Sequence, residues 1–531
     1  MISAGIAPTA ERERSVDLSA RLLRLLVFLG GFTSLAIELA GSRLLAPYFG
    51  TSLYIWAVLV GLVLLYLTAG YFIGGRLGDR RPDARLLFQL TAWAGFMTGI
   101  IPIIARPILG FSAVGFANLD AGVFLGSLVG VVLLFAVPIT LLGCVSPFAI
   151  RLALRDVSSA GNTSGRLYAL STCGSILGAL IPVFVMVPLI GTPRTFYALS
   201  LALLGLSVVG LWRHRSWYFW LLLPVACLVV LPEGVLRPAP FGRLLYATES
   251  DYYYIQVAQQ QTPSGAENDL ILDEGHAIHS IYNPNQLLTG GPWDYFMVAP
   301  YFNSAYRPSD LHSAAIIGLA GGTIARDLTA VYGPVPIDGV EIDPKIIDVG
   351  RTYFGMTEPN LNAIAQDGRY FITTTAKRYD LVGIDAYRQP YIPFHLTTKQ
   401  FFQEVRDHLT PRGVAVINAG RTETDYRLVD VIAGTMKAVF PNVFVIDLPN
   451  PQINSIVVGT NQPASLSNFA QNAAAFTDPT LRQVANTAMS QGRVREVTAS
   501  ATVFTDDWAP VEKVIDEIIL GYARGGSGEI R

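Results

Sequence analysis

Three acidic residues in the C-terminal half stand where successive buried strands are expected to end. Glu341, Asp367 and Asp385 each follow a short run of mostly apolar residues. Open α/β sheets bind ligands in a crevice at the carboxyl ends of their parallel strands, so the three carboxylates are predicted to face one crevice. Such carboxylates accept hydrogen bonds from hydroxyl and amino groups, and they can hold a cation or take a proton from it.

A glycine-rich turn precedes these acids. Residues 318–323 follow the apolar segment 314–317 and stand before a predicted helix. A turn of this kind brings backbone N–H groups and a helix N-terminus close to a ligand. Glu341 lies 23 residues after Gly318, where a carboxylate can bind both hydroxyls of a ribose. The joint spacing predicts a nucleoside site formed by Gly318, Gly321, Gly322, Glu341, Asp367 and Gly368.

Helix capping is the alternative role for some of these acids. Asp343 precedes Pro344 and Asp367 precedes Gly368, and an aspartate in that place commonly caps the following helix. Asp385 precedes the irregular segment 386–390, so capping explains it less well.

Strand and helix patterns alternate from residue 312 onward, which is typical of a parallel sheet with helical crossovers. Before them, Tyr252–Val257 and Asp269–Asp273 read as strands, with a turn at Thr262–Gly265. We therefore predict a small β-rich N-terminal module at 238–310 and a Rossmann-like α/β domain of the class I methyltransferase type at 311–531.

The composition of the first half of the chain predicts that lipid, rather than water, surrounds it. Only 15% of all residues are charged, well below the roughly 25% of average soluble domains. Apolar stretches of about 20 residues, each long enough to cross a bilayer, recur in residues 1–237. They predict a multi-pass α-helical membrane domain of about seven spans, near 22–46, 52–75, 86–108, 121–150, 166–190, 194–212 and 216–233.

Arginines gather before the first stretch and in alternate connections. Because Lys and Arg accumulate on the cytoplasmic side, the N-terminus is predicted to be cytoplasmic in a cell membrane. Seven spans then place the C-terminal half outside the cytoplasm, away from cytosolic nucleosides. Two interpretations remain open: an extracytoplasmic C-terminal half, or a span count that is wrong by one within 121–150 or at 216–233.

Composition excludes several other classes. The net charge is −2 and no basic cluster with interleaved aromatic residues is present, so nucleic acid is not an expected partner. The three cysteines lie within apolar runs, which excludes a disulfide scaffold and CxxC zinc sites. His276 and His279 would point to opposite faces of a strand, so no metal site is predicted.

At these residues the chain resembles the polyamine aminopropyltransferases, the spermidine and spermine synthases, and in particular their membrane-fused bacterial branch. The resemblance covers residues 245–420 and extends to Phe504–Glu512, which is similar to the closing motif of that branch. In the first half it rests on Glu38, Arg43, Gly50 and Gly74–Asp79.

The resemblance implies a lipid-anchored enzyme that binds decarboxylated S-adenosylmethionine and transfers its aminopropyl group to a small-molecule amine, releasing methylthioadenosine. Glu341 would hold the ribose, Asp367 the adenine amino group and Asp385 the attacking amine. An amine of pKa about 10.4 must lose a proton before it attacks, and Asp385 can take it. The resembled enzymes are commonly dimers or larger, so a homo-oligomer is also implied.

The chain departs from the family pattern on the cationic side of the site. Gly321 stands where the family has an aspartate for the aminopropyl ammonium, Tyr253 replaces a glutamine, and Arg388 and Gln389 occupy the place of a second acid. Replacement contacts to the substrate are expected among polar side chains of neighbouring segments, namely Tyr252, Tyr253, Glu274, His276, His279, Asp294, Tyr295 and His395.

These departures leave three hypotheses. The first is aminopropyl transfer from decarboxylated S-adenosylmethionine to an amine. The second is a methyltransferase that uses S-adenosylmethionine itself, with Arg388 near its carboxylate. The third is a non-catalytic membrane receptor or transport component that binds a nucleoside or polyamine. The cosubstrate used by the purified protein discriminates the first two hypotheses, and the compartment of the C-terminal half bears on the third.

Overall fold

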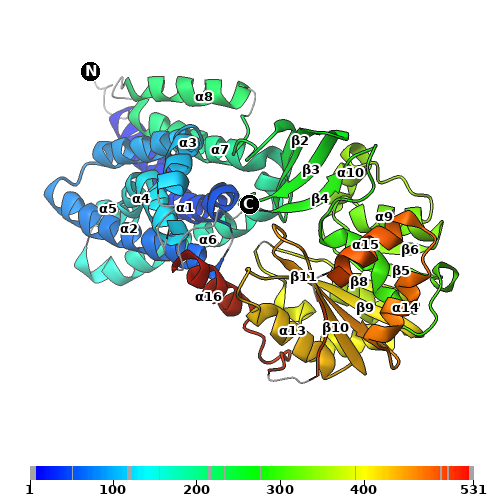
Figure 1. Ribbon diagram of the computed structural model, residues 1–531. Coiled ribbons are helices and arrows are strands. Elements are labelled where there is room, and N and C mark those ends of the chain that lie inside the picture. Colours follow the sequence, from blue (N-terminus) through cyan, green and yellow to red (C-terminus); the bar gives the residue numbers. More distant parts are fainter. Residues whose placement is uncertain are drawn as a thin grey trace, which may run out of the picture. The chain divides into compact units, whose positions relative to one another are not determined.

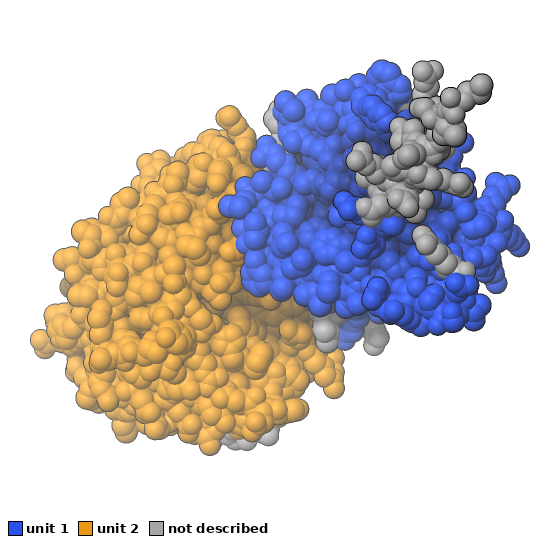
Figure 2. Space-filling view, turned by 180° about the vertical axis from the view of Figure 1, so that it is seen from behind, with its two compact units in different colours: residues 1–238 blue, residues 239–531 orange. Residues whose placement is uncertain are grey.

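A computed structural model describes residues 7–50, 52–115, 122–154, 156–212, 217–231, 234–275, 277–388, 390–490, 493–498 and 502–524 (Figure 1). The chain divides into two compact units, residues 1–238 and 239–531 (Figure 2). Each unit has its own hydrophobic clusters, and the two are described separately below.

Unit 1 is helical in its described residues. Its helices are α1 (Ala7–Phe49), α2 (Leu53–Arg80), α3 (Ala84–Gly115), α4 (Gly122–Gly143), α5 (Val145–Ala153), α6 (Ala160–Ile181), α7 (Val187–Leu211) and α8 (Leu222–Val230). By length and composition, five stretches of the described chain are able to cross a membrane: Ala20–Phe49, Tyr54–Arg80, Ala84–Ala113, Phe124–Ala153 and Val157–Leu211.

The predicted seven spans map onto these five stretches and one shorter apolar helix. The stretch Val157–Leu211 has 55 residues and contains two of the predicted spans. It includes a π-helical turn, Pro182–Met186, where Pro182 has no N–H for the regular ladder. Gly191 then leaves helical geometry altogether, with φ 78° and ψ 167°. The last predicted span corresponds to the shorter helix Trp217–Val230.

Glycines let helices α1 and α6 approach closely. A Cβ added at Gly174 would lie 2.1 Å from the backbone oxygen of Phe28, and one at Gly178 would lie 2.0 Å from that of Phe32. No side chain fits at either position, so the two helices pack backbone against backbone.

Unit 2 begins with a four-stranded antiparallel sheet in the order β1-β2-β3-β4. Its strands are β1 (Arg243–Glu249), β2 (Tyr254–Thr262), β3 (Gly265–Leu272) and β4 (Ile278–Tyr282). The β2–β3 turn lies at Thr262–Gly265, as the sequence predicted. One face of this sheet packs on α10 (Pro344–Tyr353) through a cluster that includes Ile255, Leu270 and Ile346.

The rest of unit 2 is built on an eight-stranded sheet in the order β12-β10-β11-β9-β8-β5-β6-β7. The parallel strands are β5 (Ala314–Ile317), β6 (Ile337–Glu341), β7 (Leu361–Ala365), β8 (Tyr379–Ile384) and β9 (Leu409–Gly420), and the antiparallel ones are β10 (Asn442–Asp447), β11 (Asn454–Thr460) and β12 (Val494–Glu496). The predicted fold class, apolar helices followed by a Rossmann-like α/β domain, is confirmed.

Alternating side chains of the central strands form two cores, one on each face of the sheet. In β5, Ala314 and Ile316 belong to one core, and Ala315 and Ile317 belong to the other. Each large apolar side chain buried in this way contributes roughly 1.5–3 kcal/mol. The first core is covered by α9 (Thr323–Tyr332), α14 (Leu466–Ala474), α15 (Pro479–Met489) and the 3-10 segment η5 (Pro292–Phe302). The second core is covered by α11 (Gly368–Thr374), α12 (Lys399–Asp407), α13 (Arg427–Lys437) and α16 (Val511–Arg524).

Candidate active site

The glycine turn after β5 has a backbone that favours glycine. Gly318 and Gly322 both have φ 90°, which side-chain-bearing residues rarely adopt. A Cβ at Gly318 would also lie 2.4 Å from the carbonyl oxygen of Asp385. The turn therefore lies directly against the end of β8.

The N–H groups of this turn are already paired within the protein. Gly318 donates to the Val340 carbonyl at 2.9 Å and Gly322 donates to that of Leu319 at 2.9 Å. Between them, Ala320 donates to Oε2 of Glu341 at 3.0 Å and Gly321 to Oγ of Ser280 at 2.8 Å. These hydrogen bonds fix the shape of the turn between β5 and the helix that follows it.

Glu341 ends β6 with a buried carboxylate. It accepts the N–H of Ala320 and, at 3.2 Å, the N–H of Asp343. Burial raises the pKa of Glu341 to about 7, although the two backbone donors act in the opposite direction. A carboxylate has about four acceptor sites, so these backbone donors do not use all of them.

Asp343 and Asp367 both cap helices, as the alternative interpretation predicted. Asp343 accepts the N–H of Lys345 at 2.9 Å and also accepts a hydrogen bond from the Ser250 hydroxyl. Asp367 accepts the N–H of Tyr370 at 2.9 Å. The second oxygen of Asp367 lies 3.3 Å from Nε2 of His395, and this side chain is 40% exposed. Asp367 therefore remains accessible after the end of β7, whereas both oxygens of Asp343 already accept hydrogen bonds within the protein.

Asp385 follows β8 directly and caps no helix. Its Oδ2 accepts the indole N–H of Trp293 at 2.8 Å, and its Oδ1 accepts the amide of Asn418 at 2.9 Å. Burial raises the pKa of Asp385 to about 7, and these two neutral donors oppose the shift. A carboxyl group with this pKa is suited to take a proton near neutral pH.

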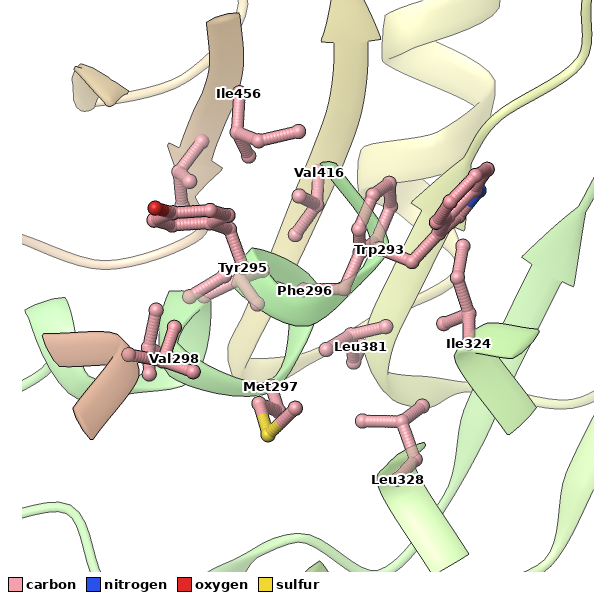
Figure 3. Close-up of a cluster of buried hydrophobic side chains, with 14 of the residues drawn as sticks. Trp293, Tyr295, Phe296, Met297, Val298, Ile324, Leu328, Leu381, Val416 and Ile456 are labelled. Carbon is pink, nitrogen blue, oxygen red and sulfur yellow. The ribbon is translucent and has the colours of Figure 1, made fainter. Parts of the chain in front are cut away.

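Trp293 and Asn418 are site residues that sequence reasoning missed. Trp293 lies at the edge of the first core, beside Ile324 (Figure 3). Asn418 is polar near the end of an otherwise apolar strand, β9, a signal that could have revealed it. Its amide is oriented by Asn454, which donates to Oδ1 of Asn418 at 2.9 Å, so Nδ2 faces Asp385.

Two tyrosines line the same region. Tyr253 is buried and donates to the Tyr387 carbonyl at 3.3 Å. Burial, followed by the charge of Glu341, raises the pKa of Tyr253 above its ordinary value, so its hydroxyl stays protonated. Tyr387 in turn donates to the Asn418 carbonyl at 3.0 Å. Tyr252, by contrast, is 40% exposed.

The remaining predicted substrate contacts have varied surroundings. Asp294 is buried and accepts hydrogen bonds from Thr289 and Gly290, so it shapes the preceding turn. Tyr295 packs in the first core. His279 is partly buried on β4, and His276 lies outside the described residues. Of the two residues in place of the family's second acid, Arg388 is exposed and Gln389 lies outside the described residues.

The neighbouring strands β8, β5, β6 and β7 carry the site at their carboxyl ends. This order brings the backbones of Gly318 and Asp385 together, and it joins Ala320 to Glu341. Asp367, at the end of β7, lies beside His395. Among the side chains that the structure describes, no cluster of three or more His, Cys, Asp or Glu residues is able to hold a metal ion.

Fold and site together define a Rossmann-like domain with carboxylates at its strand ends. A model of the family described as "Spermine/spermidine synthase domain" matches residues 305–466. The chain is 29% identical over 300 residues to a probable polyamine aminopropyl transferase of Bifidobacterium longum, which covers 53% of this chain and 65% of that protein. It is 28% identical over 205 residues to a polyamine aminopropyltransferase of Vibrio vulnificus, with 37% and 67% covered.

A solved structure, that of a probable spermidine synthase from Corynebacterium glutamicum, aligns with 55% of this chain and 99% of its own, with 16% identity and a TM-score of 0.39. The match to the first relative spans 65% of that protein's length. The family model thus matches residues 305–466, and the predicted resemblance of the C-terminal half to this family is confirmed.

Proposed function

We propose that the chain is a membrane-anchored aminopropyltransferase that uses decarboxylated S-adenosylmethionine and a small-molecule amine. The family match supports the reaction class. The five long apolar helices support the anchor.

The arrangement of Asp385 is the observation that carries the proposal. Its carboxylate accepts hydrogen bonds from two neutral donors, Trp293 and Asn418. A pKa of about 7 leaves it substantially ionised at neutral pH, so it can bind an ammonium group and accept its proton.

The reaction balances with Asp385 as the base. The acceptor ammonium gives one proton to the carboxylate and becomes a neutral amine. Its nitrogen then forms a bond to the aminopropyl carbon while the carbon–sulfur bond breaks. The sulfonium becomes the neutral thioether methylthioadenosine, the product amine keeps the positive charge, and the carboxyl group releases its proton to solvent.

Glu341 and Asp367 have hydrogen-bond acceptors that suit the nucleoside part of the donor. Glu341 keeps free acceptor sites for the ribose hydroxyls beside the turn at Gly318. Asp367 is accessible one strand further along and can accept from an adenine amino group. We assign both residues to donor binding and neither to proton transfer.

The test is release of methylthioadenosine by the purified full-length protein in detergent. The donor is supplied with a panel of diamines and longer amines, because Gly321 and Arg388 alter the side of the site that meets cations. Release with at least one amine is expected. The substitution Asp385→Asn should lower kcat by roughly 10²- to 10⁴-fold, the usual contribution of a general base.

Exposed Asp348, whose side chain is 76% accessible, provides the matched control, and Asp348→Asn should keep full activity. Formation of S-adenosylhomocysteine from S-adenosylmethionine would replace this proposal with methyl transfer. Failure of the folded protein to turn over either donor with any amine would leave a binding role only.

A further inference from the structure

The side chain of Arg369 joins three segments that are distant in the sequence. Its guanidinium forms a two-point contact with Glu404 of α12, at 2.7 and 2.8 Å. It forms a second two-point contact with Asp506, at 2.8 and 2.8 Å. It also donates to the His395 carbonyl at 3.2 Å. An arginine has five N–H donors, and these five bonds use all of them.

Arg369 and its partners, called the Arg369 hub below, lie next to the residues of the candidate donor site. Arg369 is the second residue of α11 and follows Asp367, the residue that caps this helix. The carbonyl that it holds belongs to His395, whose ring lies 3.3 Å from the Asp367 carboxylate. Arg369 thus fixes both the helix that starts at the proposed adenine contact and the turn that faces this contact.

The segment Phe504–Trp508, which carries Asp506, is itself firmly seated. Phe504 is fully buried in the second core, and its N–H donates to the Thr435 hydroxyl at 3.0 Å. Its carbonyl accepts the N–H of Lys399 at 2.8 Å. Asp506 receives a further hydrogen bond, at 2.6 Å, from the hydroxyl of Thr398, which caps α12. Asp506 is therefore presented to Arg369 from a fixed backbone.

We propose that Asp506 is a positioning residue that acts through Arg369 to hold the Asp367–His395 side of the donor site in place. The assignment of the donor site rests on the proposed function, whereas the contacts of the Arg369 hub are independent of it. Without Asp506, Arg369 loses two of its five bonds and one of its two negative partners. The hydrogen bond from Arg369 to the His395 carbonyl, in the turn at residues 394–396, then comes from a guanidinium that is less firmly held.

Hydrogen–deuterium exchange of the full-length protein tests the positioning directly. In Asp506→Asn, residues 386–398 and 368–374 should take up deuterium several-fold faster than in the wild type. Two controls should leave this exchange unchanged. Asp507→Asn removes the neighbouring exposed charge, and Glu517→Gln breaks the 2.9 Å ion pair between α16 and Arg427.

Kinetics provide the second measurement. Asp506→Asn should raise the KM for the donor by roughly tenfold, as expected for a charge-assisted hydrogen bond, with kcat changed by less than about threefold. Arg369→Lys keeps the charge but cannot form two forked contacts, so it should reproduce the effect. A purely structural loss would instead raise exchange throughout residues 239–524.

Exchange at 386–398 that equals the wild type in both variants overturns the inference, and so does a uniform rise across the unit in both. If no donor and amine pair is turned over at all, the proposed function fails. The exchange experiment still decides the positioning role, because it needs no activity.

Discussion

At the scale of single residues, the two strand-end aspartates Asp367 and Asp385 have different surroundings. Asp385 accepts hydrogen bonds from two neutral side chains and has a pKa raised to about 7 by burial. Asp367 caps a helix and is 40% exposed. A strand-end aspartate can therefore serve as a base or as a binding contact, and the protein groups around it decide which.

Trp293 should control the pH dependence of the reaction. Its N–H bond favours the ionised form of Asp385, so Trp293→Phe should raise the pKa of that carboxyl further. Since Asp385 must be deprotonated to act as a base, the acidic limb of the kcat/KM profile should move to higher pH. At pH 6.5 the variant should lose roughly tenfold in rate, the size expected for a hydrogen bond to a charged group.

The profile of kcat/KM against pH, measured from 5.5 to 9.5, checks this expectation, and the variant should approach wild-type rates at the alkaline end. Trp508→Phe is the control, because its exposed indole packs on Phe504 and should leave the midpoint unchanged. An acidic limb that stays in place in Trp293→Phe would rule out Asp385 as the titrating base.

At the scale of elements, the sequence predicted the strands and the glycine turn because their signals are local. The run Ala314–Ile317 and the turn at Gly318 are legible within about ten residues, and β5 and its turn lie where they were expected. The partners of Asp385 were not predictable in this way. Trp293 and Asn418 lie 92 and 33 residues from it, and no local pattern marks a contact between side chains so far apart.

The partner of the Gly321 N–H could not be predicted from the sequence either, because this partner, Ser280, belongs to a different sheet. A glycine-rich sequence predicts a turn with available donors. Only the packing of β4 against this turn shows that Gly321 is already engaged. A glycine motif therefore predicts the turn itself more securely than it predicts the partners of its N–H groups.

Gly318→Ala tests the contact between the turn and the end of β8. The new Cβ would lie 2.4 Å from the Asp385 carbonyl oxygen, in addition to the strain of a positive φ, which costs about 1 kcal/mol. Gly333→Ala is a matched control, because Gly333 has φ 78° and nothing within 4 Å of its added Cβ.

Thermal unfolding should show a loss of about 1 kcal/mol for Gly333→Ala and of about 3 kcal/mol or more for Gly318→Ala, as for other overpacked sites. Activity should fall only in Gly318→Ala, since the displaced backbone carries Asp385. Equal losses in the two variants would show that the turn and β8 are not in contact.

At the scale of the whole molecule, the two units follow different physical rules. Unit 2 buries its central strands between two apolar cores, whereas unit 1 exposes large apolar side chains such as Phe72, Phe111 and Leu189. Sequence reasoning located the apolar stretches and placed a boundary between the spans 166–190 and 194–212, where helix α7 breaks at Gly191. It did not locate the π-helical turn Pro182–Met186.

The break at Gly191 leads to a topological prediction. If both parts of Val157–Leu211 cross the membrane, the five stretches supply six crossings. The helix Trp217–Val230 rises only about 21 Å at 1.5 Å per residue, short of a hydrocarbon core of about 30 Å. Both chain ends should then lie in the cytoplasm, where the proposed donor is made available.

Reporter fusions to the C-terminus of the full-length chain, one active only in the cytoplasm and one only outside it, provide the measurement. Signal from the cytoplasmic reporter is expected. Signal from the other would restore an odd number of crossings and the extracytoplasmic interpretation. The control is a pair of fusions ending in the connection between α2 and α3, at residues 81–83, whose neighbouring arginines predict a cytoplasmic location.

The contact between Arg369 and Asp506 has a consequence for synthesis of the chain. A ribosome makes the parallel strands β5 to β9 and their acidic residues well before it reaches Asp506. A nascent polypeptide can thus fold most of its sheet while the helix that begins after Asp367 still lacks one of its anchors. Termination just before residue 506 would remove this partner of Arg369, together with the α16 side chains that belong to the second core.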